Sequence, residues 1–333
     1  MTTTTDGIQA VSSRVPTRGV SAWGGPVRRS RAAWLPGSTT GRVVVIGFGT
    51  YFGLVVAIPM GFLAWTSLQD AFLLRNVFIG LNNYSALLAD PIVLRSFGVT
   101  LEYAAMTVPL QVVLGFGLAS LLFYGIRSSR IRTFLAGFFF LPVVTPVAVI
   151  ATVWKFVLLP TENGLLNSII VAVGGQPVHW LVSPETALLG LAMTHWIPGT
   201  GLAAILFLAG LTALPREVDE AACIDGAGPL ARLRFVTFPL MIPTVALVWI
   251  VELTSAAQMF VPVLVMTGGD ISTFLPKGGP DFATHTYVWN LYLNGFQYYR
   301  EGFAAALSLV LLAGLLVLGV LQLKLARRYT HVT

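Results

Sequence analysis

The chain has 333 residues, of which 56% are hydrophobic and 10% are charged, and its net charge is +6. A soluble domain has about a quarter of its residues charged, so this composition excludes a soluble globular protein and indicates a membrane protein. The single cysteine, Cys223, excludes an internal disulfide and a cysteine-rich metal site, and we expect no metal on this chain.

The first segment, residues 1–41, is rich in Thr, Ser, Gly and Arg and lacks the apolar core of a cleavable signal peptide. We therefore predict a flexible cytoplasmic tail here, with its arginines acting as an orientation signal.

Six apolar stretches then follow, each longer than the roughly 20 residues that a membrane-spanning helix requires. Backbone groups in lipid must be hydrogen-bonded internally, so we predict helices. The predicted spans are Val43–Thr66, Val99–Phe123, Thr133–Leu159, Thr186–Leu214, Pro239–Thr267 and Gly302–Leu325. The predicted fold is an all-α membrane protein, with residues 42–327 as its six-helix domain and residues 328–333 as a cytoplasmic C-terminal tail.

The distribution of Lys and Arg predicts the orientation of these spans. If both termini are cytoplasmic, fifteen of the 20 basic residues fall on the cytoplasmic side, as the positive-inside rule requires. The three longer outer segments each contain a short apolar stretch that we expect to lie on the membrane surface: Phe78–Pro91, Thr161–Glu185 and Thr267–Tyr299.

A polar cytoplasmic loop, residues 215–238, interrupts the apolar pattern between the fourth and fifth spans. Pro215 suits the first turn of a short helix, and the acidic residues that follow suit its N-terminus. The glycines of "DGAG" (Asp225–Gly228) end this helix, and Pro229 begins a second one that we expect Pro239 to end. The pattern predicts helix–turn–helix with a narrow face of small residues, at which another protein can approach closely.

The sequence "EAACIDGAGPLARLRFVTFPLMIP" from Glu220 resembles the cytoplasmic coupling motif of ATP-binding cassette (ABC) importer permeases. In that motif three residues separate E-A-A from G, and P-L-x-x-P comes later. "FIGLNNYSALL", "FLAGLTALPREV" and "EGFAAALS" resemble the carbohydrate-uptake branch of that family. The usual TGGGP run of this branch is split here into "TGGD" and a later "KGGP". The positions that match the coupling motif within 220–227 are Glu220, Ala221, Ala222, Asp225, Gly226 and Ala227.

The resemblance implies a type I importer permease of the bacterial inner membrane that takes up a sugar or sugar-like solute, including glycerol phosphodiesters. It also implies a coupling helix that sits in a groove of an ATP-hydrolysing subunit. Lys155, Lys277 and Lys324 are the only lysines and none lies in a G-x-x-x-x-G-K-[ST] context, so this chain is not the ATPase. The implied partners are two copies of an ATPase that uses ATP and Mg²⁺, a second and different permease chain, and an extracytoplasmic solute-binding protein, with no nucleic acid.

Polar residues inside the spans are costly and mark a candidate solute path. Hydrogen-bonding groups beside aromatic faces suit a sugar, and the alternative role is to hold the helices together. Glu252, Ser255 and Gln258 fall within one sector of about 120° on the fifth span. The proposed path residues are Glu252, Ser255, Gln258, His195, Trp196 and Gln111.

Two other functions fit a chain with six spans. A secondary transporter or channel works without an ATPase, but it needs several buried ionisable groups or a selectivity motif, and repeat symmetry is common in such carriers. A membrane-bound enzyme needs acids or histidines clustered at a membrane face, whereas the only acidic cluster here lies in the coupling motif.

Overall fold

The computed structural model describes residues 39–72, 75–268 and 278–330, in two compact units, Met1–Pro59 and Met60–Thr333. Five of its helical stretches are long and apolar enough to cross a membrane, and a sharply bent pair of helices gives a sixth when the pair is counted as one span. This agrees with the predicted six spans. Nearly all of the predicted N-terminal tail lies outside the described residues.

The first predicted span is a 29-residue helical stretch, Thr39–Ser67. It consists of α1 (Thr39–Phe52), a π-helical turn η1 (Gly53–Ala57) and α2 (Ile58–Ser67). Large apolar side chains along it are exposed, among them Phe48 and Phe62, as expected of a helix that faces lipid.

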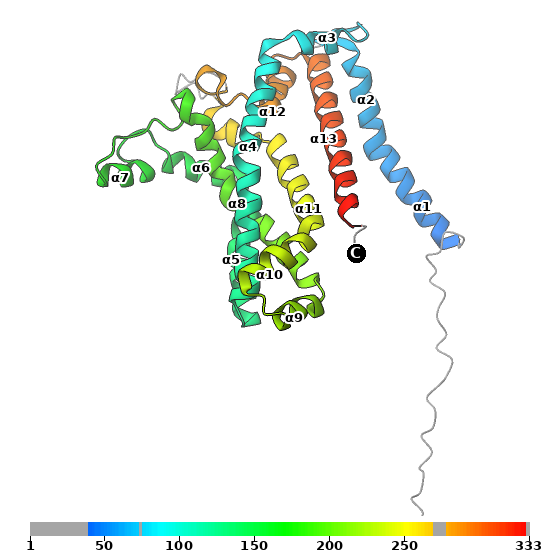
Figure 1. Cartoon of the computed structure of the whole chain (residues 1–333). Coiled ribbons are helices and arrows are strands. Elements are labelled where there is room, and N and C mark those ends of the chain that lie inside the picture. Colours follow the sequence, from blue (N-terminus) through cyan, green and yellow to red (C-terminus); the bar gives the residue numbers. More distant parts are fainter. Residues whose placement is uncertain (1–38, 73–74, 269–277, 331–333) are drawn as a thin grey trace, which may run out of the picture. The chain divides into compact units, whose positions relative to one another are not determined.

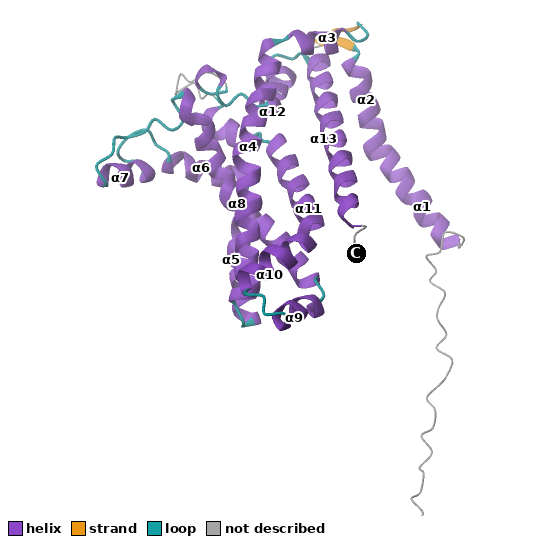
Figure 2. Cartoon of the chain, in the orientation of Figure 1, coloured by secondary structure: helices purple, strands orange, loops and turns teal. Residues whose placement is uncertain are grey.

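A small antiparallel hairpin follows, which the sequence pattern did not predict (Figure 2). Its strands are β1 (Gln69–Phe72) and β2 (Arg75–Phe78), with Asp70 opposite Val77, and α3 (Asn82–Ala89) comes next. The buried Asn83 amide donates hydrogen bonds of 2.8 Å to the carbonyls of Ser67 and Gln69. A tertiary contact therefore fixes this hairpin, whose four-residue strands are too short to show a pattern of their own.

The core of the second unit is the packing of α4 (Pro91–Ser120) against α8 (Pro184–Ala213). A π-helical turn, η2 (Leu121–Gly125), extends α4. The two helices approach closely where both have small residues: a Cβ built on Gly115 would lie 2.5 Å from the Cβ of Ala203. Fully buried side chains on both helices, such as Tyr103 and Phe207, complete the core.

The third predicted span, Thr133–Leu159, is not one straight helix. It is α5 (Ser129–Val144) and α6 (Val147–Val157), bent by 89°. Thr145 between them is extended, with φ −75° and ψ 132°, because the residue before a proline is disfavoured in the helical region and Pro146 follows. Pro142, inside α5, and Pro146, just before α6, flank this bend.

Helix α7 (Leu165–Ala172) and the loop after it are held by one buried side chain, Asn167. Its amide donates to the carbonyls of Leu159 and Val178, and its oxygen accepts from the indole N–H of Trp180. Asn167 therefore ties α7 and the loop after it to the end of the third predicted span.

The helix–turn–helix predicted for residues 215–238 is present, but Pro239 does not end it. The loop contains α9 (Arg216–Ile224) and α10 (Pro229–Arg232), and a π-helical turn, η3 (Leu233–Thr237), leads directly into α11 (Phe238–Ala257). The helical stretch is continuous from Leu230 to Ala257. Pro239 has no backbone N–H to donate. The π turn immediately before it changes the pattern of backbone hydrogen bonds, and the helix continues without that donor.

The fifth helix also ends earlier than predicted, at Ala257 rather than Thr267. A separate π-helical turn, η4 (Val263–Thr267), begins after Pro262. A proline has no N–H to donate within a helix, which favours a break at this point.

The last outer segment contains η5 (Pro280–Phe282), α12 (Tyr287–Tyr292) and the π-helical turn η6 (Leu293–Gln297). The prediction of a surface segment is wrong for α12, which packs against α4 and α13 with Trp289 fully buried. The final helix, α13 (Glu301–Thr330), takes in residues 328–330 of the predicted C-terminal tail.

The second unit has two distinct ends (Figure 1). The hairpin, α3 and α12 lie toward one end, and α9 and α10 lie at the other. Two candidate sites follow from this arrangement, one at the α9 end and one among the buried polar groups between the helices.

We expect Gly115→Val to destabilise the protein by about 2 kcal/mol, because a larger side chain would separate α4 from α8. Gly117→Val is the matched control, since nothing lies within 4 Å of a Cβ built there. Thermal unfolding of the purified protein in detergent measures the difference. Equal unfolding temperatures for the two variants would contradict the proposed packing.

Candidate functional site

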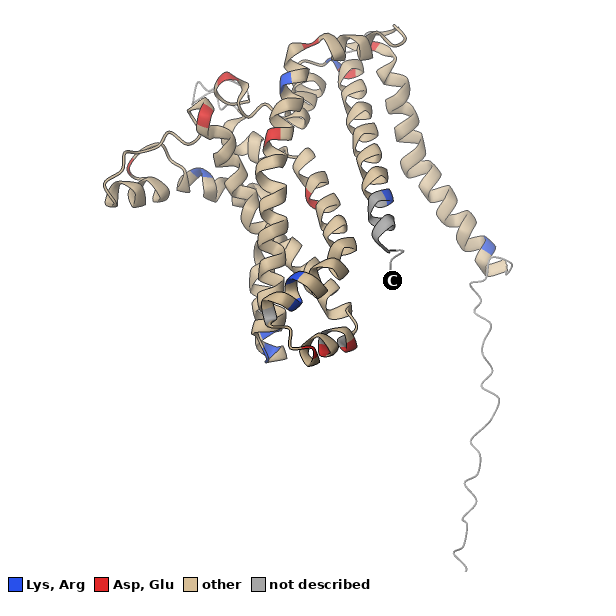
Figure 3. Ribbon diagram, viewed as in Figure 1, with Lys and Arg blue, Asp and Glu red and all other residues tan. Residues whose placement is uncertain are grey.

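The first candidate site is α9 with the turn that follows it. Figure 3 shows acidic residues along α9 and basic residues on the neighbouring segments at the same end of the second unit. Among the motif residues, Glu220, Ala221 and Asp225 are exposed, whereas Ala222 is only 9% exposed and faces the protein. α9 therefore rests on the rest of the loop through a small side chain and presents its other face outward.

The turn after α9 requires a glycine. Gly226 has φ +77°, a left-handed conformation that side chains other than glycine rarely adopt. Its N–H bonds to the carbonyl of Cys223 at 3.1 Å, and the N–H of Ala227 bonds to the carbonyl of Ala222 at 3.0 Å. These two bonds form a Schellman motif, which satisfies the last carbonyls of a helix and reverses the chain.

Large apolar side chains are exposed around this turn. Ile224 is 86% exposed and Leu230 is 77% exposed. Both border the turn that Gly226 makes. Exposed apolar side chains gathered in one place mark a surface at which a partner binds.

A pocket of about 340 Å³ lies beside α9, bordered by Val218, Glu220, Arg132, Tyr124 and Thr237. The Tyr124 hydroxyl and the Thr237 hydroxyl are 2.8 Å apart, which joins η2 to η3. Among the described side chains, no Lys or Arg nitrogen lies within 4.0 Å of the Glu220 carboxylate. Glu220 therefore forms no ion pair inside the described part of the loop.

The second candidate site is a pocket of about 160 Å³ where the bend between α5 and α6 meets α8 and α11. His195, Glu252 and Ser255 all border it, so three of the six predicted path residues come together here. The imidazole Nε2 of His195 lies 4.0 Å from Glu252 Oε2 and 3.4 Å from Ser255 Oγ.

Glu252 is the most unusual group in this pocket, because its side chain is 1% exposed. Its second oxygen, Oε1, has no hydrogen-bond partner among the described residues. A buried acceptor without a donor is costly, so this oxygen is suited to receive a hydrogen bond from a solute.

Gln111 lies behind this pocket rather than in it. Its side chain is fully buried and its amide donates to the carbonyl of His195 at 2.9 Å, so it positions that residue. Gly199 makes room for it, because a Cβ there would overlap the Gln111 amide.

The other two predicted path residues lie elsewhere. Trp196 packs against the hydrophobic core, and its indole N–H is buried with no partner among the described residues. Gln258 is exposed at the end of α11 and does not border the pocket.

Tyr103 was not predicted from the sequence. It is fully buried on α4, and its ring lies edge-on to that of His195, with 6.3 Å between the ring centroids. Its hydroxyl has no partner among the described groups. Tyr103 precedes Gln111 by eight residues, which places the two within about 80° around a helix. This eight-residue spacing is the feature of the sequence that could have indicated Tyr103.

Comparison with known proteins identifies the class. The family model for the inner membrane component of binding-protein-dependent transport systems matches residues 111–331. The sn-glycerol-3-phosphate transport system permease protein UgpA of Yersinia enterocolitica is 32% identical over 81% of this chain and 88% of its own length. The trehalose/maltose transport system permease protein MalF of Thermococcus litoralis is 28% identical over 86% of this chain and 93% of its own.

The fold also matches a solved structure. A chain of a bacterial ABC transporter involved in import of the acidic polysaccharide alginate superposes with a TM-score of 0.73, at 18% identity, over 87% of this chain and 95% of that one. At this identity the match shows the fold, that of a type I ABC importer permease.

Fold and sites thus define a multi-pass transporter subunit. The chain belongs to the family of inner membrane components of binding-protein-dependent transport systems.

Proposed function

We propose that this chain forms one half of the translocation path of an ATP-driven importer for a sugar or sugar-like solute, including glycerol phosphodiesters. The observation that carries the proposal is α9, a short helix that bears the coupling-motif sequence and is ended by a left-handed glycine. It is exposed at one end of the second unit, and the chain continues from it through α10 and η3 into α11.

In this proposal α9 sits in a groove of the ATPase, and the exposed Ile224 and Leu230 contribute apolar contact. Glu220, exposed and without an ion pair in the described loop, contacts a basic residue of the ATPase. The continuous helix from Leu230 to Ala257 then carries movement of the loop to the buried pocket. ATP and Mg²⁺ are bound by the ATPase, and this chain catalyses no reaction.

The solute class rests on the relatives and on the chemistry of the pocket. The relatives named above are permeases for sn-glycerol-3-phosphate and for trehalose and maltose. Glu252, Ser255 and His195 supply acceptor and donor atoms for hydroxyl groups. Trp196 and Gln258 remain proposed parts of the path, reached at another stage of transport, and Gln111 is a positioning residue.

The proposed assembly contains this chain, a second and different permease, two ATPase copies and an extracytoplasmic binding protein. Both termini and α9 face the cytoplasm, and the hairpin and α3 face the opposite side. The distribution of basic residues along the sequence supports this orientation.

We expect Gly226→Val to abolish transport while the complex still assembles. A β-branched residue in the left-handed region costs about 1–2 kcal/mol, which is enough to reshape the turn. Reconstitution with all partners, measuring complex recovery, ATP hydrolysis and uptake, tests this.

Gly228→Val is the control, because a Cβ at either glycine meets open space and only Gly226 has a positive φ. Wild-type uptake by Gly226→Val, or equal loss in both variants, would contradict the proposed role of the turn.

The native Cys223 reports the orientation directly, since it is the only cysteine and is exposed. We expect a membrane-impermeant maleimide to label it in inside-out vesicles and not in intact cells. Leu88→Cys, combined with Cys223→Ser, should give the opposite result, because Leu88 is exposed on α3. Labelling of Cys223 from outside would show that the proposed orientation is inverted.

We expect Ser255→Ala to raise the solute concentration for half-maximal uptake by about three- to tenfold, the effect of one lost hydrogen bond. Thr254→Val removes a neighbouring hydroxyl that bonds to the carbonyl of Ile250 and does not border the pocket. Uptake titrations in reconstituted vesicles compare the two. A solute contact at Ser255 is refuted if both variants behave alike.

A further inference from the structure

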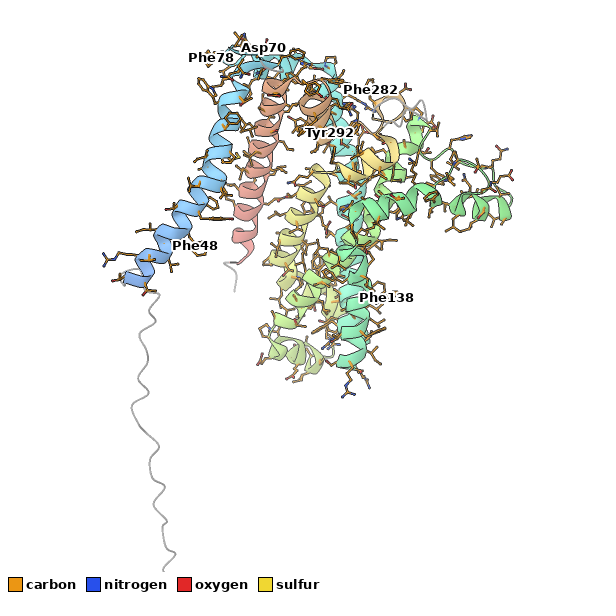
Figure 4. All side chains as sticks on the ribbon, turned by 180° about the vertical axis from the view of Figure 1, so that it is seen from behind. Phe48, Asp70, Phe78, Phe138, Phe282 and Tyr292 are labelled. Atoms are coloured by element: carbon orange, nitrogen blue, oxygen red, sulfur yellow. The ribbon has the colours of Figure 1, made fainter. Side chains whose placement is uncertain are left out.

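A third pocket, lined by polar side chains, lies at the other end of the second unit from α9. Its volume is about 360 Å³, within the range of small-molecule sites, and it lies where the N-terminus of α4 meets α12 and η6. The bordering residues that matter are Asp90, Phe282, Asn290, Asn294, Tyr298 and Arg300. Figure 4 shows Phe282 and Tyr292 toward the same end as Asp70 and Phe78 of the hairpin.

A chain of hydrogen bonds ends in this pocket with an unmatched donor. Arg300 Nη1 donates to Asn294 Oδ1 at 3.4 Å, and Asn294 Nδ2 donates to Asn290 Oδ1 at 3.0 Å. Arginine can only donate, so the first bond fixes the orientation of the Asn294 amide and, through it, that of Asn290.

Asn290 Nδ2 is therefore left as a donor at the end of the chain. Asn290 is 3% exposed, and this nitrogen has no partner among the described residues. A buried donor without an acceptor is costly, so the pocket is suited to a ligand that supplies an acceptor oxygen.

Asp90 supplies a hydrogen-bond acceptor to the same pocket, whereas Asn290 supplies a donor. One of its oxygens, Oδ1, accepts the backbone N–H of Ile92 at 2.8 Å and caps α4. Its charge is not paired with Arg300, because no nitrogen of that guanidinium lies within 4.0 Å of the carboxylate. The carboxylate accepts hydrogen bonds, and its negative charge offsets the positive charge of Arg300 in the same pocket, which favours a neutral ligand over an anion.

Two aromatic side chains border the pocket, and the backbone at or beside them is strained. Phe282 and Tyr298 both border the pocket and are 43% and 47% exposed. Phe282 has φ +57° and Tyr299, next to Tyr298, has φ +55°, both in the left-handed region that side chains other than glycine rarely adopt. Backbone strain of this kind is typical of ligand-binding segments.

We propose that this pocket binds a neutral, hydroxyl-rich solute, a sugar or polyol, at the outer end of the transporter. A hydroxyl group accepts from Asn290 Nδ2 and a neighbouring hydroxyl donates to Asp90, while the aromatic rings contact the apolar face of the sugar. The choice of solute class rests on the proposed function, and the pocket is separate from the one that contains Glu252.

The test is equilibrium binding to the complete complex in lipid nanodiscs, without ATP, by saturation-transfer NMR. The neutral probe is maltose and the anionic probe is sn-glycerol 3-phosphate. We expect Asn290→Leu to weaken maltose binding about tenfold, and the exposed Asn82→Leu at the same end of the second unit to leave it unchanged.

Asp90→Asn is the second variant, because asparagine still provides the oxygen that caps α4. We expect it to weaken maltose binding and to strengthen sn-glycerol 3-phosphate binding, each by a factor of about three or more. If the complex with Asn290→Leu does not assemble, the Asp90→Asn variant alone tests whether the pocket binds maltose.

The proposal is overturned if both variants bind maltose within twofold of the wild type. It is also overturned if the variants lose affinity only for the solute-binding protein, which would make the pocket a protein contact. ATP-driven uptake by the wild-type complex is measured in parallel. Failure of uptake with pocket binding intact would refute the proposed function and leave the pocket assignment standing.

Discussion

The close packing of α4 against α8 is the constraint on which the other features depend. In lipid there is little hydrophobic force between helices, so small residues that let backbones approach are what hold a bundle together. Gly115 and Ala203 provide such a contact, and Gly199 provides another by making room for Gln111. Gln111 then reaches the carbonyl of His195 and so fixes one wall of the buried pocket.

The two ends of the second unit follow different physical rules. At the α9 end the motif residues are exposed, and one left-handed glycine sets the shape of the turn. At the other end the buried Asn290 and Asn294 are linked to each other and to the exposed Arg300. An exposed, locally determined turn suits a contact that a partner completes, whereas a buried network suits recognition of a small solute.

Most of the fold could be predicted from hydropathy. A membrane-spanning helix must be both long and apolar, and the sequence shows directly which segments meet both conditions. The turn at Gly226 was also predictable, since glycine spacing alone indicated it. The bend at Thr145 was only partly visible: two prolines marked a break, but its 89° angle depends on how α6 packs. The hairpin, the buried α12 and the Asn167 contacts depend on residues distant in sequence, and no local pattern indicates them.

Among the candidate residues, Glu252 and Ser255 were found because a polar side chain in an apolar helix is conspicuous. Their meeting with His195 was not deducible, because it depends on the relative rotation of α8 and α11. Tyr103 escaped notice because a tyrosine is ordinary in a membrane helix and its unsatisfied hydroxyl is seen only in three dimensions.

The π-helical turn η3 allows the length of the chain between the loop and the pocket to vary without changing the orientation of α11. A π turn holds about one residue more than an α-helical turn within a similar rotation of the chain. The extra residue in Leu233–Thr237 is therefore taken up inside the turn, and Glu252 faces His195 as it would after a regular α-helical turn. Single-residue differences in length among related permeases should therefore be tolerated better at this segment than within α11, where each added residue rotates everything beyond it by about 100°.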